Sequence, residues 1–321
     1  MQDFEELSRE FLNRFNTSHF PQKPESLYQP AEYFLGLGGK RVRPVMCLMG
    51  NELFDEIKPH TWDVATAIEL FHNFTLIHDD IMDKAPLRRG MPTLHEKFGH
   101  SNALLAGDVM LVVAYDYINK VPQSNIHKII QLFNSTAKAV CEGQQLDMDF
   151  ERTPEVSLAD YLQMIELKTS VLLAASLKMG AMLGGAGEGN QQHIAAFGRN
   201  LGLAFQIQDD YLDAFGDPAK FGKQSGGDIV ANKKTYLLCR AMQLASASQQ
   251  KEMLELLAAD SPDKVVRMIS IFKSCGVDEE SKILMERYLS GAFQHLEDIA
   301  VLANRKEPLR QLARFLVQRD Y

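Results

Sequence analysis

Apolar residues recur at three- and four-residue spacing along almost the whole chain, and this helical period constrains the fold more than any other feature. Residues 62–83 are the clearest case, because neither Pro nor Gly interrupts them. The same period predicts helices at 101–119, 124–142, 158–180, 191–213, 229–258, 262–274 and 278–302. No run shows the convincing alternation of a β-strand. The pattern therefore predicts an all-α chain that packs as a large helical bundle.

The size and charge of the chain narrow the choice further. The 321 residues are 45% hydrophobic and contain neither a Pro/Gly/Ser-rich linker nor a repeat of fixed period. We therefore expect a single domain over residues 1–321, with one large core. The net charge of −8 argues against a broad basic face and against a nucleic-acid partner.

The cysteines and the most apolar segment bear on location. The four cysteines are far apart and form no CxxC pair, which is typical of reduced thiols in the cytoplasm. The first residues are acidic, whereas a signal peptide would begin with basic residues. The most apolar stretch, residues 171–185, is interrupted by Lys178. We therefore expect a cytoplasmic protein without a transmembrane segment.

Two Asp-Asp-x-x-Asp clusters are the strongest chemical signal. They comprise Asp79, Asp80 and Asp83, and then Asp209, Asp210 and Asp213. The first and last Asp of each cluster lie about 40° apart around a helix and so share a face. Each cluster ends an apolar helix, where like charges repel and the helix dipole disfavours them. Oxygen-only ligands prefer Mg²⁺, so we interpret the clusters as metal sites and not as a solvated acidic surface.

Basic residues near the clusters suggest what the metal would hold. Mg²⁺ is commonly bound by a few carboxylates together with substrate phosphates, so a diphosphate is the natural partner. Cations occur in the loop 38–44, in the loop 88–90 directly after the first cluster, at Lys168, at Lys223 and at 232–235. Each basic segment alone would be weak support, because short Lys/Arg pairs are usually solvated surface. Their place beside the aspartates makes them candidate phosphate ligands.

At this point the sequence resembles the trans-type isoprenyl diphosphate synthases, of the short-chain geranylgeranyl or farnesyl kind. The motifs that carry the resemblance occur in family order. They are Gly-Gly-Lys-Arg-Val-Arg-Pro at 38–44, Leu-Ile-His-Asp-Asp-Ile-Met-Asp at 76–83, Arg88-Arg89-Gly90, Ala106-Gly107-Asp108, Lys168-Thr169, Phe-Gln-Ile-Gln-Asp-Asp-Tyr-Leu-Asp at 205–213, Gly222-Lys223, Gly227-Asp228-Ile229 and Asn232-Lys233. Residues 1–30 and those beyond about 240 match only as generic helix.

The resemblance implies an isoprenoid synthase-type bundle around a central cavity, a homodimer, and an enzyme that condenses isopentenyl diphosphate with an allylic diphosphate. It implies three Mg²⁺ ions, with Asp79, Asp83 and Asp209 as principal ligands and Asp80, Asp210 and Asp213 as ligands or their supports. The implied residues for the allylic diphosphate are Arg88, Lys168, Thr169, Gln206, Lys223 and Lys233, and the catalytic residues among them are Lys168, Thr169 and Gln206. Those of isopentenyl diphosphate are Lys40, Arg43, His72 and Arg89.

Three of these residues also have a physical argument of their own. His72 lies seven residues before Asp79, about 20° from it around the helix, so it shares that face, although a lone His in an apolar helix is more often core. Ionisation of the allylic C–O bond leaves a carbocation, which neutral polar groups can stabilise and which a nucleophile would trap. Thr169 and Gln206 suit that position better than a carboxylate, and the departing diphosphate can accept the final proton.

Product length depends, by the resemblance, on the residues four and five places before the first cluster, here Thr75 and Phe74. These positions form the floor of the chain pocket in the family. One ring and one small residue suggest a floor that is half closed, and so a C15 to C20 product with C20 favoured. The alternatives are that Phe74 is ordinary core and that the product is a longer polyprenyl chain. The sequence does not identify the preferred allylic primer.

Other classes of protein remain as alternatives. A terpene cyclase would usually replace the second cluster with an Asn/Ser/Glu type and would not need the basic loop. A catalytically dead partner subunit would usually lose one cluster, and both are present. A di-iron carboxylate bundle needs two Glu-x-x-His motifs, and Glu69-Leu-Phe-His72 is the one we find.

Overall fold

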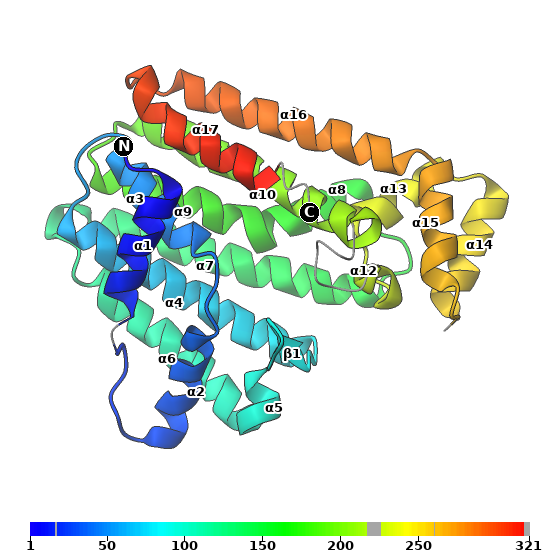
Figure 1. Cartoon of the computed structure of the whole chain (residues 1–321), viewed down its shortest axis with the longest axis horizontal. Coiled ribbons are helices and arrows are strands. Elements are labelled where there is room, and N and C mark those ends of the chain that lie inside the picture. Colours follow the sequence, from blue (N-terminus) through cyan, green and yellow to red (C-terminus); the bar gives the residue numbers. More distant parts are fainter. Residues whose placement is uncertain (17, 217–225, 260, 318–321) are drawn as a thin grey trace. The chain divides into compact units, whose positions relative to one another are not determined.

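The computed structural model describes residues 1–16, 18–216, 226–259 and 261–317, and almost all the regular secondary structure in them is helical (Figure 1). This confirms the predicted all-α class. The helices are α1 (Phe4–Phe15), α2 (Glu25–Gly36), α3 (Val42–Glu52), α4 (Pro59–Met82), α5 (Leu94–Phe98), α6 (His100–Ile118), α7 (Gln123–Arg152), α8 (Leu158–Ile165), the π-helix η1 (Glu166–Ser170), α9 (Val171–Leu183), α10 (Glu188–Phe215), α12 (Gly227–Val230), α13 (Tyr236–Leu244), α14 (Ala247–Ala258), α15 (Lys264–Ser274), α16 (Val277–Asp298) and α17 (Ala303–Val317). Two short strands, β1 (Leu87–Arg88) and β2 (Met91–Pro92), form an antiparallel hairpin.

The helices form two compact units. The first contains Met1–Ser135, Ala175–Ile194 and Ala300–Pro308, and the second contains Thr136–Ala174, Ala195–Ile299 and Leu309–Tyr321. Four helices (α7, α9, α10 and α17) contribute residues to both units. The single domain over residues 1–321 stays a prediction.

In the first unit, α4 is the central helix, and more than half of its side chains are buried. It packs against α3 and α6. Gly107 of α6 allows a close approach, because a Cβ atom there would lie 2.4 Å from Nε2 of His78 on α4. The uninterrupted helical pattern of residues 62–83 thus corresponds to a real helix, which begins at Pro59 and ends at Met82.

Glycines allow α9 to pack closely against α3. A Cβ atom at Gly180 would lie 1.9 Å from the carbonyl oxygen of Cys47 on α3, and one at Gly50 would lie 2.3 Å from that of Leu177. The glycines therefore allow α3 and α9 to pack backbone to backbone. Among the described residues, no helix combines the length and the apolar character that crossing a bilayer requires.

The second unit has its own hydrophobic core. Buried side chains from α8, α10 and α13–α16 meet in it, including Tyr161, Ile207, Leu237, Met253 and Phe272. The neighbouring helices α14 and α15 lie side by side (Figure 1). This core supports the end of α10, where the second aspartate cluster lies.

The predicted continuous helix over 229–258 was wrong, because three helices occupy this region. Asn232 adopts a left-handed backbone conformation with φ 56°, which ends α12. The Thr235 side chain accepts the Leu238 N–H at the start of α13, and Ser246 forms a capping box with Gln249 at the start of α14. Apolar spacing alone continues across such caps, so it could not show the breaks.

Candidate active site

The first aspartate cluster lies at the carboxyl end of α4. The Asp83 N–H donates to the Asp79 carbonyl oxygen at 2.8 Å, so these two residues lie one turn apart on the same face. Asp79 is half-buried and Asp83 is exposed. Asp80 points elsewhere, and its side chain is only 2% exposed. The cluster therefore has two outward carboxylates and one inward carboxylate.

Arg88 holds the inward carboxylate. Its Nε donates to both oxygens of Asp80, at 2.9 and 2.8 Å, and its Nη2 donates to Oδ1 at 2.7 Å. Arg88 can reach because it lies on β1 of the hairpin that follows α4, where Arg89 and Gly90 have φ 54° and 77° and make the tight turn. In the structure Arg88 therefore supports Asp80, a role additional to its predicted one as a ligand of the allylic diphosphate.

The residues predicted for isopentenyl diphosphate gather in the first unit. Arg43 donates from Nη1 to Nε2 of His72 at 3.1 Å. Because a guanidinium has no acceptor, this ring nitrogen accepts, and the proton of the neutral imidazole lies on Nδ1. Burial, followed by the charges of Arg43 and Arg89, holds the pKa of His72 well below its usual value.

The two basic loops meet at Gly39. A Cβ atom there would lie 2.9 Å from Nη2 of Arg89, so the absence of a side chain lets the guanidinium lie against the backbone. Burial, together with the charges of Arg41 and Arg88, lowers the pKa of Arg89. Lys40 follows directly and is exposed. This concentration of positive charge around a neutral histidine suits an anion such as a diphosphate.

The Glu69-x-x-His72 motif does not present a shared pair of metal ligands. The Glu69 carboxylate accepts from the Arg41 guanidinium and from Nδ2 of Asn73, the latter at 2.9 Å. The His72 ring is bonded to Arg43. Each half of the motif is therefore held by a guanidinium, which disfavours the di-iron alternative.

In the second unit, the second cluster repeats the division into outward and inward carboxylates. Asp209 and Asp213 are half-buried, whereas Asp210 is 5% exposed. The hydroxyl of Tyr161 donates to Oδ2 of Asp210 at 2.5 Å, and the Tyr236 N–H donates to the same oxygen at 2.8 Å. Burial raises the pKa of Asp210 to about 7, although these two hydrogen bonds oppose the rise.

The outward Asp213 also orders the chain that follows the cluster. Its Oδ2 accepts the Asp228 N–H at 3.0 Å, and its carbonyl oxygen accepts the Gly226 N–H at 2.7 Å. Lys233 lies nearby in the chain, with Nζ 3.9 Å from Oδ1 of Asp228, and is exposed. Lys223 lies outside the described residues. Asp213 is thus both a candidate ligand and the anchor of α12.

Lys168 and Thr169 lie on the π-helix η1, and π-turns of this kind often occur at functional sites. Lys168 donates from Nζ to Oδ2 of Asp147 at 2.5 Å. Thr169 donates to Oε1 of Gln206 at 3.2 Å, and Gln206 donates in turn to Oδ1 of Asp210 at 3.3 Å. The structure therefore joins Thr169 and Gln206 to the inner aspartate of the second cluster, whereas Lys168, on the same π-helix, is held by Asp147.

Sequence reasoning missed Asp147 and Tyr161, which hold Lys168 and Asp210. Tyr161 lies 49 residues from its partner, and Asp147 lies 21 residues from Lys168. Neither belongs to the motifs that we considered, and an acidic residue or a tyrosine on a helix gives no signal by its spacing alone. Only the contacts of α7 with η1 and of α8 with the cluster-bearing α10 could identify them.

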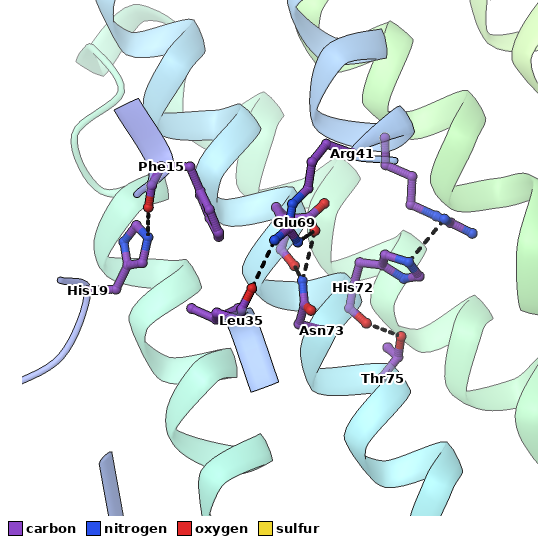
Figure 2. A network of polar contacts seen from close by, with 9 residues as sticks. Phe15, His19, Leu35, Arg41, Glu69, His72, Asn73 and Thr75 are labelled. Atoms are coloured by element: carbon purple, nitrogen blue, oxygen red, sulfur yellow. Dashed lines mark hydrogen bonds and ion pairs between the residues drawn. The ribbon is translucent and has the colours of Figure 1, made fainter. Parts of the chain in front are cut away.

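Phe74 and Thr75 point to different sides of α4. The Phe74 ring packs against His78 and Phe71, with centroids 4.7 and 5.7 Å apart. Thr75 donates from Oγ1 to the His72 carbonyl oxygen at 2.8 Å (Figure 2). Thr75 therefore accompanies the His72 face, whereas Phe74 belongs to an aromatic cluster on the face that meets α6.

Both clusters fit a hard divalent cation by the chemistry of their donors. Each offers carboxylate oxygens at the end of an apolar helix, and each has an inner Asp fixed by protein groups. Oxygen donors of this kind select Mg²⁺ over softer metals. Asp79 and Asp83 in the first unit and Asp209 and Asp213 in the second are the residues that could hold it.

Comparison with known proteins supports this chemistry. The polyprenyl synthetase family model matches residues 24–273. The short chain isoprenyl diphosphate synthase of Methanothermobacter thermautotrophicus is 37% identical over 303 residues, covering 93% of this chain and 92% of that protein. A crystal structure of a geranylgeranyl pyrophosphate synthase is 39% identical, with a TM-score of 0.94 and full coverage of both chains. That of the Corynebacterium glutamicum enzyme, complexed with isoprenyl diphosphate and magnesium, is 27% identical over 98% of each chain, with a TM-score of 0.85. The chain therefore belongs to the polyprenyl synthetase family and is a prenyltransferase.

Proposed function

We propose that the chain is a Mg²⁺-dependent short-chain trans-prenyl diphosphate synthase that condenses isopentenyl diphosphate with an allylic diphosphate to give a C15 to C20 product, C20 favoured. The observation that carries the proposal is the pair of clusters with anchored inner aspartates, Asp80 on Arg88 and Asp210 on Tyr161. Anchoring of this kind holds the outer carboxylates in place for a cation and its diphosphate. A cyclase, a di-iron protein or an inactive subunit is not favoured by the family or by these contacts.

The outer carboxylates Asp79, Asp83 and Asp209 would be the principal ligands of three Mg²⁺ ions. When bound, Mg²⁺ would neutralise the charge that develops on the departing diphosphate. The support for the metal is the oxygen-only donor set, together with the magnesium in the corynebacterial relative. Asp80 and Asp210 would act as supports, because protein donors already occupy their oxygens.

Two sets of cations and polar groups would hold the two substrates. Lys40, Arg43, His72 and Arg89 would hold isopentenyl diphosphate, and Arg88, Lys168, Lys223 and Lys233 would hold the allylic diphosphate. The allylic C–O bond breaks and leaves a carbocation, which the dipoles of Thr169 and Gln206 would stabilise without adding to it. The isopentenyl double bond attacks to form the new C–C bond. A proton then leaves carbon for the departed diphosphate, which completes the elimination.

The proposal includes a homodimer. Support comes from α6, whose surface carries the exposed apolar side chains Leu104, Leu105 and Val112. Such a face is suited to a two-fold helix-to-helix contact. Leu105→Asp should shift the chain toward monomer in analytical sedimentation at micromolar concentration, whereas Leu254→Asp, at a similarly exposed leucine of α14, should not. A monomeric wild-type chain would contradict this part of the proposal.

A cytoplasmic location is also part of the proposal. All four cysteines are free, which is typical of a reducing compartment. Cell fractionation would test this directly, and recovery of the chain in an oxidising compartment would contradict it.

The deciding experiment is an assay with radiolabelled isopentenyl diphosphate and allylic primers of five, ten and fifteen carbons. We expect incorporation that stops on chelation, returns with Mg²⁺, and gives products that end at C20. No incorporation with any primer, with Mg²⁺ present, would refute the function. Products well beyond C20 would keep the reaction but contradict the chain length.

A further inference from the structure

Arg41 differs from the other cations of the 38–44 loop because its side chain turns into the protein. It is 5% exposed, whereas the preceding Lys40 is exposed. Its guanidinium bonds to the Glu69 carboxylate and donates from Nη2 to the Leu35 carbonyl oxygen at 3.0 Å (Figure 2). The ring of Phe15 lies 5.1 Å from it on another side. Arg41 is therefore enclosed, and it does not present its charge to a substrate.

The backbone of Arg41 sets the course of the loop. It has φ 51° and ψ 34° at the N-cap of α3, a left-handed conformation that residues other than glycine rarely adopt. Such a conformation persists only where the surroundings enforce it, and it occurs often at functional sites. Lys40 precedes this change in backbone direction and Arg43 follows it. The backbone conformation of Arg41 therefore fixes the positions from which both side chains project.

Glu69 is fixed just as firmly on the other side of the ion pair. Its side chain is 4% exposed and also accepts from Nδ2 of Asn73 at 2.9 Å, one turn further along α4. His72 lies within that same turn, and it accepts from Arg43 at 3.1 Å. The Arg41–Glu69 pair therefore ties the loop that carries two cations to the helix that carries the histidine (Figure 2).

The charges indicate that the pair acts through geometry. Glu69 balances the charge of Arg41, and the two charges shift the pKa of Arg89 in opposite directions, so the pair adds no net charge to the anion site. Buried ion pairs also contribute little net stability, because desolvation offsets their attraction. A role in stability alone thus explains the pair poorly, whereas a role in specifying one arrangement of the loop explains its burial and its backbone conformation.

We propose that Arg41 and Glu69 form a positioning pair for isopentenyl diphosphate, holding Lys40 and Arg43 in register with His72. The inference rests on the proposed assignment of that substrate to these residues. It predicts a specific kinetic signature. Disturbing the pair should weaken the binding of isopentenyl diphosphate and leave the allylic substrate and the chemical step almost unchanged.

The test compares Arg41→Met, Glu69→Gln and the double variant Arg41→Met/Glu69→Met with the wild type. The single variants should melt at lower temperature, because each leaves a buried polar partner, and the double variant should recover much of the loss. All three should raise KM for isopentenyl diphosphate about tenfold or more, since small misplacements of binding groups are costly. KM for the allylic substrate and kcat should change less than about threefold.

Asp63→Asn is the matched control, because it removes from the same helix a half-buried carboxylate that pairs with the exposed Lys120. It should leave both KM values at the wild-type level. A double variant with wild-type KM for isopentenyl diphosphate would overturn the inference, and so would a wild-type KM in Glu69→Gln should the double variant not fold. A wild-type chain that condenses nothing would instead refute the proposed function, so the two failures are distinguishable.

Discussion

Replacing Arg88 with Met should destabilise the first unit, because the buried carboxylate of Asp80 would lose its charged partner. Arg88 makes three hydrogen bonds to Asp80, at 2.7 to 2.9 Å, and these are the contacts that hold the inward carboxylate of the first cluster. The Asp80 side chain is 2% exposed. Loss of the guanidinium would therefore leave a negative charge in a place that water hardly reaches.

The expected magnitude follows from burial. Removing one member of a fully buried pair costs about 3 to 5 kcal/mol, because the other charge stays desolvated. The Arg88 side chain is 26% exposed, so water can replace part of what it supplied. We therefore expect a loss of about 2 to 3 kcal/mol in the free energy of unfolding. Adding Asp80→Leu to the same chain should restore much of that loss.

Urea unfolding of the two single variants, the double variant and the wild type forms a double-mutant cycle that isolates the coupling between the residues. Lys120→Met is the control, since its ion pair with Asp63 involves the same helix but leaves a carboxylate that is 28% exposed, against 2% for Asp80. It should cost less than about 1 kcal/mol. A loss below about 0.5 kcal/mol in Arg88→Met would refute the anchoring argument. If Arg88 also binds the allylic diphosphate, KM for that substrate should rise in the same variant.

Four further predictions concern the site. Asp79→Ala or Asp209→Ala should each lower the rate at least ~10³-fold in a Mg²⁺-supplemented assay, and a near-normal rate would contradict the metal assignment. Arg89→Ala should raise KM for isopentenyl diphosphate about tenfold and spare the allylic KM, so equal effects on both would contradict the division of substrates. Phe74→Ala should give longer products if the ring forms the pocket floor, and an unchanged product spectrum would show that the stop lies elsewhere. Since the folded pKa of His72 lies below 6.5, wild-type stability should fall as pH drops through that value. The stability of His72→Gln, measured by urea unfolding, should fall less than that of the wild type between about pH 7 and pH 5. An equal fall in stability would contradict the lowered pKa of His72.

The helical wheel could predict part of the cluster geometry. Spacing placed Asp79 and Asp83 on one face, and the structure shows them one turn apart at the end of α4. The same spacing turns Asp80 away by about 100°. What spacing could not supply was the partner of Asp80, because Arg88 reaches it only through the turn of the β1–β2 hairpin. A contact that depends on a two-residue turn produces no periodic pattern in the sequence.

The basic loop shows the opposite limit. Lys40, Arg41 and Arg43 are equivalent in composition, yet one of them is enclosed by Phe15 and Glu69. Its burial depends on α1 and α4, which lie far from it in the chain. The sequence could not predict the π-helix at 166–170 either, because one extra residue in a turn barely alters the apolar spacing. Long-range packing and single-residue irregularities therefore could not be predicted from the sequence.

The two clusters reach a similar charge by different means. In the first, three carboxylates and the guanidinium of Arg88 sum to −2. In the second, Asp210 is held by a neutral hydroxyl and a backbone N–H, and burial raises its pKa to about 7, so near neutral pH it carries only part of its charge. Each cluster thus approaches the two negative charges that one divalent cation balances. A cation nearby would favour the ionised form of Asp210, whose oxygens accept, among the described residues, from the neutral donors of Tyr161, Tyr236 and Gln206.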